Sequence, residues 1–391
     1  MYLTREQEKI LAGEYGWAYA KALEIIVKVG GALGAEKLIP ITHAHVSGIS
    51  YTNIGDPGLE FIRDFYKGGV KAKVYTTINP GCIDLLGSSR IISDEPRDKQ
   101  LEINQYLERM GFKPTYTCIP YIHRRPVVDE HLAWGESSAV IFANSVFGAR
   151  TNREGGPLAL AAGLTGYTYY YGLHLLENRV AEVKIVLEDI EPDYYGGLGL
   201  WIGDNIRETP IIMNLKPSIP HIKLLLAAAA ASGGHGLIVL NNLTPPKTYS
   251  VDDSAEKIHV DKKDIMEYTG SLSDIQGEVI GYIGCPHLDP FEFEELFNLI
   301  KTHEKLKKDY KLLVSIPRIY ADLYRDEILF LKKRGVDVVV GTCPIVSILR
   351  DKPDYIVTNS GKAAFYLKRL HGIDTVVAPL SNIIEILFGD Q

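Results

Sequence analysis

Residues 278–344 read EVIGYIGCPHLDPFEFEELFNLIKTHEKLKKDYKLLVSIPRIYADLYRDEILFLKKRGVDVVVGTCP, and this stretch decides the fold class. The runs at 278–284, 311–316 and 336–341 predict strands, and the segments 291–303 and 320–334 between them predict helices. The run at 336–341 is typical of a strand buried in a parallel sheet. Strands that alternate with helices indicate an α/β protein with largely parallel sheets.

The same alternation extends outward from this stretch through the rest of the chain. Strands are predicted at 37–46, 73–78, 114–119, 138–147, 179–187, 209–215, 235–243, 355–358 and 375–378. Helices are predicted behind the N-cap Thr4 and at 58–66, 97–110, 220–231, 362–371 and 380–388. The glycine-rich segment 194–199 predicts a loop, and the polar segment 245–264 predicts a surface connection. We therefore expect two regions, 1–250 and 251–391.

The composition narrows the function classes. The chain has 391 residues, with 42 Lys and Arg against 49 Asp and Glu, so its formal net charge is −7. This acidic balance argues against a nucleic-acid binder that works through a basic surface. The N-terminus is charged and lacks the apolar core of a signal peptide. The longest apolar run, 224–231, is far shorter than the roughly 20 residues of a membrane span. We expect a cytoplasmic protein.

The four cysteines carry the sharpest chemical signal. Cys82, Cys118, Cys285 and Cys343 each lie near the end of a predicted strand, with a proline close by. Because proline has no N–H to donate, it ends the ladder and leaves the cysteine in a loop. The carboxyl edge of a parallel sheet, where such loops lie, is where ligands bind.

The spacing of the cysteines leaves several interpretations open. No C-x-x-C occurs, so any metal site has to be gathered from distant strands. Three converging thiolates would suit an iron–sulfur cluster with one iron that lacks a protein ligand and can act as a Lewis acid. Four would favour a closed structural metal site. The ordinary alternative is that each cysteine is a small buried hydrophobe.

Polar segments lie at the end of the predicted strand 37–46 and at both ends of the predicted strand 138–147. Residues 43–50 form a small, polar loop that suits an anion, and residues 135–138 place a carboxylate beside two hydroxyls. Residues 144–153 carry two arginines and two amides, which suit a carboxylate or phosphate clamp. For each loop the alternative is a solvated surface turn.

Five short motifs together point to a known family. They are Tyr-Thr-Cys-Ile-Pro-Tyr (116–121), Gly-Cys-Pro-His (284–287), Thr-Cys-Pro (342–344), Gly-Glu-Ser-Ser (135–138) and Asn-Ser-Val-Phe-Gly-Ala-Arg-Thr-Asn (144–152). As a set they resemble the aconitase X family, over nearly the whole chain and nearest to its archaeal type. The resemblance implies a large catalytic subunit of several α/β units, with mainly parallel sheets around a central cluster site.

The resemblance also implies an activity and a cofactor. It implies a hydro-lyase with an iron–sulfur cluster, preferably 4Fe-4S with one iron open to substrate, on Cys118, Cys285 and Cys343. Cys82 lies outside these motifs, and its role stays open. Archaeal members dehydrate (R)-5-phosphomevalonate to trans-anhydromevalonate 5-phosphate on the mevalonate route to isoprenoids. The alternatives are dehydration of another hydroxyacid, such as cis-3-hydroxyproline, and a structural zinc-binding scaffold that uses all four cysteines.

The family's substrate pocket maps onto named positions of this sequence. The implied substrate-binding residues are Gly48, Ile49, Ser50, Asn79, Pro80, Glu136, Ser137 and Lys362. The family also needs a small swivelling domain that supplies an essential serine. Because the sequence ends at Gln391, soon after the predicted helix 380–388, we expect this domain to be a separate small subunit. No catalytic residue is assigned to the present chain.

Overall fold

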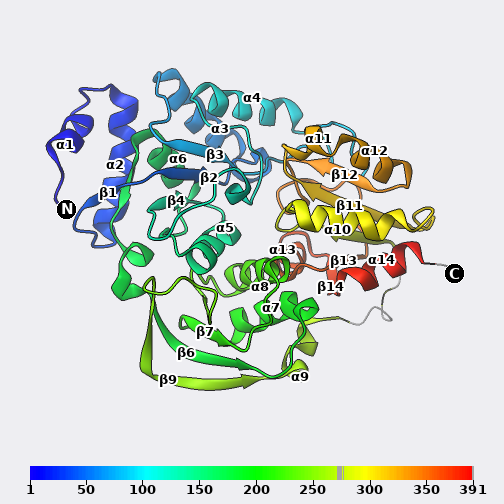
Figure 1. The fold of residues 1–391 in the computed structure, drawn as a ribbon. Helices are drawn as coiled ribbons and strands as arrows, with labels where there is room; N and C mark the ends of the chain where they lie inside the picture. Colours follow the sequence, from blue (N-terminus) through cyan, green and yellow to red (C-terminus); the bar gives the residue numbers. More distant parts are fainter. Residues whose placement is uncertain (271–274, 276, 390–391) are drawn as a thin grey trace.

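The structure is a computed structural model that describes residues 1–270, 275 and 277–389. Three parts follow one another along the chain, and each contains a parallel sheet (Figure 1). The N-terminal part extends to residue 178, the middle part to residue 270, and the C-terminal part begins at the strand β10. Among the described residues, no helix combines the length and the apolar character that crossing a membrane requires.

The N-terminal part holds the parallel sheet β3-β2-β4 and the antiparallel pair β1-β5. Its strands are β1 (Leu38–Pro40), β2 (His43–Val46), β3 (Tyr75–Ile78), β4 (Leu132–Trp134) and β5 (Tyr167–Tyr169). Its α-helices are α1 (Arg5–Leu11), α2 (Trp17–Ala32), α3 (Tyr51–Lys67), α4 (Arg97–Arg109), α5 (Ser137–Phe142) and α6 (Gly156–Thr165). Short turns are η1 (Pro120–Ile122), the π-helical η2 (Ala143–Phe147), η3 (Gly172–His174) and η4 (Leu176–Asn178).

Several predictions for this part hold and several do not. Thr4 caps α1 through a capping box, as expected. The segment 37–46 forms two strands, β1 and β2, which lie in different sheets. Segment 58–66 lies in α3, which begins earlier, at Tyr51.

The predicted strand 114–119 is wrong. The Thr115 hydroxyl accepts a hydrogen bond from the Ile78 N–H and donates one to the Ile78 carbonyl, both at 2.9 Å. This side chain thus bonds backbone groups of β3 that a neighbouring strand would pair. The backbone then turns at Tyr116, whose φ is 41°.

The predicted strand 138–147 is also wrong, because these residues form α5 and η2. A short apolar run that is buried on all sides gives no periodicity that separates a helix from a strand. The local signal is Glu136, whose carboxylate accepts a hydrogen bond from the Ser138 N–H and caps the helix.

The middle part is built on the parallel sheet β8-β7-β6-β9. Its strands are β6 (Val180–Leu187), β7 (Pro210–Met213), β8 (Val239–Leu240) and β9 (Ser250–Val260). Its helices are η5 (Pro192–Tyr194), α7 (Tyr195–Asn205), α8 (Ile219–Ser232), α9 (Lys262–Ile265) and η6 (Met266–Tyr268). Most of α8 is buried, from Ile222 to Ala230, and it packs against α5, α7 and α13.

Two predictions for the middle part are corrected. The segment predicted as a loop, 194–199, contains the first turns of α7. Its glycines let α7 approach α8 closely, since a methyl group on Gly199 would overlap the Leu225 carbonyl oxygen. The segment predicted as a connection, 245–264, contains β9, a charged edge strand paired with β6. The expected boundary between residues 250 and 251 falls at the start of β9, and this division stays a prediction.

The C-terminal part holds the parallel sheet β12-β11-β10-β13-β14. Its strands are β10 (Val279–Ile283), β11 (Tyr310–Ile316), β12 (Asp337–Val340), β13 (Tyr355–Thr358) and β14 (Asp374–Val377). Its helices are α10 (Pro290–Lys301), α11 (Tyr320–Leu323), α12 (Arg325–Lys333), α13 (Gly361–His371) and α14 (Leu380–Phe388). All the predicted elements of this part are confirmed, except that the helix 320–334 is interrupted at Tyr324.

The close approach of α7 to α8 predicts opposite effects for two Gly→Ala substitutions. In Gly199→Ala, the added methyl would also lie 2.7 Å from Ala228 Cβ, so we expect a loss of about 1–3 kcal/mol in the free energy of unfolding. Gly31 lies in α2 with open space around it, and Gly31→Ala should raise that free energy by up to about 1 kcal/mol through helix propensity. Urea unfolding followed by circular dichroism measures both, and equal effects would contradict the packing argument.

Candidate functional site

Three of the four cysteines gather where the N-terminal and C-terminal parts meet. Cys285 follows β10 and Cys343 follows β12, at the carboxyl edge of the C-terminal sheet. Cys118 comes from the N-terminal part, and its Sγ accepts a hydrogen bond of 3.2 Å from the His287 backbone N–H. A glycine turns the chain before Cys285, since Gly284 has a φ of 111° and an added Cβ there would overlap the Ser315 carbonyl oxygen.

Cys285 lies close enough to Cys118 and Cys343 to raise the pKa of both thiols. Burial raises the pKa of Cys343 to about 12, and the nearby Cys285 adds to this. Burial likewise raises the pKa of Cys118, with smaller contributions from Glu136 and Cys285. Lys362 opposes these shifts at all three thiols. Thiols in such a place ionise when a metal cation binds them, because cysteine ligates as the thiolate.

The donor set fits a cluster better than a single ion. Three thiols on separate loops, with a lysine ammonium near them, match the chemistry of an iron–sulfur cluster, which is ligated by thiolates. Within residues 1–270, 275 and 277–389, no three His, Cys, Asp or Glu side chains are arranged to hold one metal ion.

Cys82 lies in the turn after β3, outside the three motifs that carry the other cysteines, and it supports a loop. It is buried, and its Sγ lies 3.0 Å from Gln100 Oε1 as a donor. The same Gln100 oxygen accepts from the Tyr51 N–H at 2.8 Å, and the Gln100 amide donates to the Ile49 carbonyl at 3.0 Å. Cys82 and Gln100 therefore hold the start of α3 in place.

A pocket of about 270 Å³ opens between the N-terminal part and α13. Five of the predicted substrate-binding residues line it, namely Gly48, Asn79, Glu136, Ser137 and Lys362. Its other lining residues are Ser47, Asn53, Gly135, Arg153, Ile345, Val346, Tyr366 and Leu370. The pocket thus joins residues from the segment after β2, the turn after β3, the start of α5, the Cys343 loop and α13.

The other three predicted residues are not among those that line the pocket. Ile49 belongs to the hydrophobic core, and Pro80 is buried. Ser50 is buried, and its hydroxyl donates to the Val346 carbonyl at 2.6 Å. Thr52 donates to the same carbonyl at 2.8 Å. These contacts tie the loop before α3 to the loop that carries Cys343.

An ion pair between Lys362 and Glu136 crosses the pocket wall. Lys362 is 6% exposed, and its ammonium contacts a Glu136 carboxylate oxygen. Burial alone would raise the pKa of Glu136, but Lys362 lowers it to about 2. The same pair, together with the thiols, keeps the pKa of Lys362 above its ordinary value although burial opposes this. Both groups are therefore charged at neutral pH.

Of the clamp predicted at 144–153, only Arg153 reaches the pocket. The Asn144 amide donates to two backbone carbonyls, and Arg150 pairs with Asp129. Arg153 is exposed, and among the described residues its guanidinium has no carboxylate partner and donates only to the Ala230 carbonyl, at 3.4 Å. Arg153 thus brings an uncompensated positive charge to the pocket.

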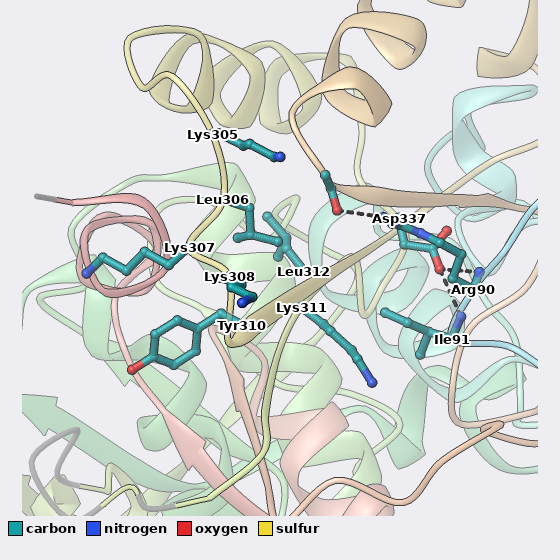
Figure 2. A pocket seen from close by; sticks show the side chains of 11 residues that line it. Arg90, Ile91, Lys305, Leu306, Lys307, Lys308, Tyr310, Lys311, Leu312 and Asp337 are labelled. Atoms are coloured by element: carbon teal, nitrogen blue, oxygen red, sulfur yellow. Dashed lines mark hydrogen bonds between the residues drawn. The ribbon is translucent and has the colours of Figure 1, made fainter. Parts of the chain in front are cut away.

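A larger hollow, of about 340 Å³, lies elsewhere. Figure 2 shows its lining, which includes Arg90, Lys305, Lys307, Lys308 and Lys311. It lies at the amino ends of β11 and β12, the edge of the sheet opposite to the cysteines. Its carboxylate, on Asp337, already accepts hydrogen bonds from three donors in residues 89–91. This hollow is separate from the thiols.

Comparisons with known proteins agree with the sequence motifs. The aconitase X first-domain family matches residues 1–177, its second domain matches 178–270, and its third domain matches 279–389. These ranges coincide with the three parts of the structure. The crystal structure of Thermococcus kodakaraensis aconitase X in its holo form superposes with a TM-score of 0.89 and 39% identity, over 99% of this chain and 100% of that one.

Curated relatives carry two kinds of names. The phosphomevalonate dehydratase large subunit of Thermococcus kodakarensis is 39% identical over 98% of this chain and 99% of that protein. The one of Methanocaldococcus jannaschii is 40% identical over 100% and 98%. The cis-3-hydroxy-L-proline dehydratase of Hypocrea jecorina is 29% identical over 98% of this chain and 68% of that longer one.

The buried ion pair predicts a strong non-additivity between two substitutions. Lys362→Met leaves the Glu136 carboxylate buried without its cation, which should cost about 3–5 kcal/mol of unfolding free energy at pH 7. Adding Glu136→Gln should restore most of this loss, because the uncompensated charge disappears. Since the Glu136 pKa is lowered, the pair stabilises the fold above pH 4.5 and loses this effect as the pH falls toward about 2. Additive losses at pH 7 would show that the pair is not coupled.

Proposed function

This chain belongs to the aconitase X family of hydro-lyases, and from this membership we propose that it is the large subunit of a phosphomevalonate dehydratase. The reaction would remove water from (R)-5-phosphomevalonate to give trans-anhydromevalonate 5-phosphate, in the mevalonate pathway of archaeal type. The two relatives with 39–40% identity bear this name, whereas the hydroxyproline dehydratase is more distant, at 29%.

The free charge of Arg153 is the observation that favours a phosphorylated substrate. The other cation of the pocket, Lys362, is already neutralised by Glu136. A phosphate on the substrate therefore needs a further cation, and Arg153 offers one with several donors in a plane. Asn53 also lines the pocket, and its side-chain amide is a further hydrogen-bond donor for the phosphate.

The cysteines carry the second part of the proposal. Cys118, Cys285 and Cys343 would hold an iron–sulfur cluster, because they are the thiols that gather at the meeting of two parts. Several irons would let the three ligands bind at separate points of one cluster. When bound, such a cluster supplies a Lewis acid for the substrate hydroxyl and carboxylate.

The protein's own groups would bind and orient the substrate beside these thiols. Arg153 would bind the phosphate end, while Asn79, Glu136 and Ser137 offer hydrogen bonds to its hydroxyl groups. Lys362 keeps Glu136 ionised, so this carboxylate accepts rather than donates. We assign no catalytic base on this chain and propose that the small swivelling subunit contributes an essential serine.

The lengths of the relatives support the proposal of a separate small subunit. The proteins named large subunits match this chain over nearly their whole length, whereas this chain covers 68% of the hydroxyproline dehydratase. The alternative substrate is a hydroxyacid without phosphate, such as cis-3-hydroxyproline, for which the free charge of Arg153 has no evident use. A zinc-binding scaffold is the alternative outside catalysis.

The ligand assignment predicts different results for two Cys→Ser variants. The chain would be purified without oxygen, with and without a co-expressed small subunit, and assayed for iron, acid-labile sulfide and dehydration. Cys343→Ser should lose the cluster and the activity, while Cys82→Ser should keep the iron and sulfide of the parent, because the Cys82 thiol donates to Gln100 and lies outside the three ligand motifs. A full cluster in Cys343→Ser would refute the assignment. A zinc-loaded protein, inactive with the partner, would favour the scaffold.

The phosphate assignment predicts a substrate-specific loss in Arg153→Ala. We expect kcat/KM for 5-phosphomevalonate to fall by about 100-fold, mainly through KM, as for loss of a charged hydrogen-bonding partner. Arg153→Lys should recover part of this loss, since it keeps the charge but not the fork of donors. The nearby Arg150→Ala is the matched control and should keep KM, because Arg150 pairs with Asp129. An unchanged KM in Arg153→Ala would contradict the phosphate contact, and preference for hydroxyproline would contradict the substrate.

A further inference from the structure

Behind the pocket, a row of polar side chains lies inside the N-terminal sheet. His43 and His45 point to the same face of β2, and Thr77 of β3 lies directly across from His45 in the parallel ladder. His43, His45 and Thr77 are all fully buried. Trp134 of β4 packs edge-on against both rings, with centroids 5.2 Å and 6.4 Å away. Buried polar groups of this kind need a function or at least a complete set of partners.

Hydrogen bonds link this row to the pocket. His43 Nε2 and His45 Nδ1 each lie 2.8 Å from Thr77 Oγ1. On its other side, His45 Nε2 lies 3.1 Å from Asn79 Oδ1. The Asn79 amide then donates to Glu136 Oε2 at 3.2 Å. The row therefore ends on the carboxylate that Lys362 keeps ionised.

The direction of each bond follows from the charge at the end of the chain. Because the Glu136 carboxylate can only accept, Asn79 must turn its NH₂ group toward it and its oxygen toward His45. His45 Nε2 must then carry a proton and its Nδ1 must be bare. The Thr77 hydroxyl has one proton and donates it in a hydrogen bond to the unprotonated His45 Nδ1. His43 Nε2 must therefore be protonated and donate to Thr77 Oγ1. The other acceptor for Thr77, the Ala44 carbonyl, is farther away at 3.5 Å.

Two further observations agree with this direction. The far nitrogen of the first ring, His43 Nδ1, is buried without a hydrogen-bond partner. A bare nitrogen there is less costly than an unpaired N–H. Burial lowers the pKa of His43 well below its ordinary value, and lowers that of His45 to about 4 although its bond to Asn79 opposes this. Both rings are therefore neutral, as a one-way chain requires.

We propose that His43, Thr77 and His45 form a one-way hydrogen-bond chain that holds Asn79 in one orientation, in which Glu136 Oε2 accepts from Asn79 and keeps a second lone pair for a donor of the substrate. These three are positioning residues for the proposed dehydration, and the proposal rests on that function only for its activity readout. The other carboxylate oxygen, Oε1, is already occupied by Lys362 and by both the amide and the hydroxyl of Ser138. Oε2 receives only Asn79 among the described residues.

If Asn79 turned over, its oxygen would face the Glu136 carboxylate and repel it. Two groups oppose this turn, the Glu136 carboxylate on one side of Asn79 and the proton on His45 Nε2 on the other. The place of that proton depends in turn on the Thr77 hydroxyl. A threonine inside the sheet thus adds to the preference for the orientation of Asn79 that the Glu136 carboxylate favours.

The first test determines which ring nitrogen of His43 and of His45 carries a proton. The full chain, labelled with ¹⁵N in histidine and purified with its cluster, would be examined by two-bond ¹H–¹⁵N correlation spectra. His43→Gln and His45→Gln identify the two rings by the signals that disappear. We expect both rings to be neutral with the proton on Nε2. A proton on Nδ1 of either ring, or a charged ring at pH 7, would overturn the proposal, whatever substrate the protein acts on.

The second test removes one hydroxyl from the chain. Thr77→Val keeps the size of the side chain, and in the complex with the small subunit we expect kcat/KM to fall by about tenfold, the effect of losing one or two hydrogen bonds. Thr77→Ser should restore activity to within about twofold. Thr76→Val is the matched control, because Thr76 is buried in the same strand and its hydroxyl, within the described part of the chain, donates only to the Val74 carbonyl.

The outcomes separate this proposal from the proposed function. Two results together would support the hydrogen-bond chain. One is an altered His45 tautomer and a reduced kcat/KM in Thr77→Val. The other is a kcat/KM close to that of the parent in Thr76→Val and Thr77→Ser. Equal activity in Thr77→Val and Thr76→Val, at equal cluster content, would overturn it. If the parent complex does not dehydrate phosphomevalonate, the proposed function fails. The spectra of the parent and of Thr77→Val still test whether the hydrogen-bond chain exists.

Discussion

The ion pair between Glu136 and Lys362 is the contact on which the site depends. It is buried, and it joins the start of α5 in the N-terminal part to α13 in the C-terminal part. Desolvating both charges is costly, so the pair is stable only when the two parts are docked and each charge keeps its partner. The same lysine lowers the pKa of the Cys118 thiol against the effect of burial, and the same carboxylate accepts from the Asn79 amide. The docking of the two parts, the shape of the pocket and the charges around the thiols therefore depend on the same ion pair.

The sequence predicted the C-terminal part well and the other two parts less well. In β12 and its neighbours, long apolar strands alternate with amphipathic helices, so period and composition agree. The errors at 114–119 and 138–147 have tertiary causes. A threonine hydroxyl replaces strand pairing at Ile78, and a fully buried run hides the period of α5. The glycines of α7 look like a loop because their role, close contact with α8, is visible only in the packing.

For the site, the sequence located the side chains better than their partners. Prolines near predicted strand ends marked the cysteines, although the strand predicted before Cys118 does not form. The motifs separated Cys82 from the other three, which the structure brings together. What the sequence could not show is which groups are already satisfied. The Ser50 hydroxyl donates to the Val346 carbonyl, 296 positions away, and Arg153 has no carboxylate partner among the residues that the structure describes. The order His-x-His on β2 opposite a threonine on β3 was readable, but its meaning required the strand register.

The edge strand β9 has a consequence for how the molecule behaves beside copies of itself. Eleven residues long, it lies at the outside of its sheet and offers one row of backbone groups without a neighbouring strand. Such a row is a template for adding another chain, and it leads to aggregation when it is flat and apolar. Here the exposed side carries Asp252, Asp253, Glu256 and Lys257, and the register with β6 shifts at Ala181. Charge and irregular pairing together stop the sheet from growing between molecules, so the polar character that disguised this strand in the sequence protects it from self-association.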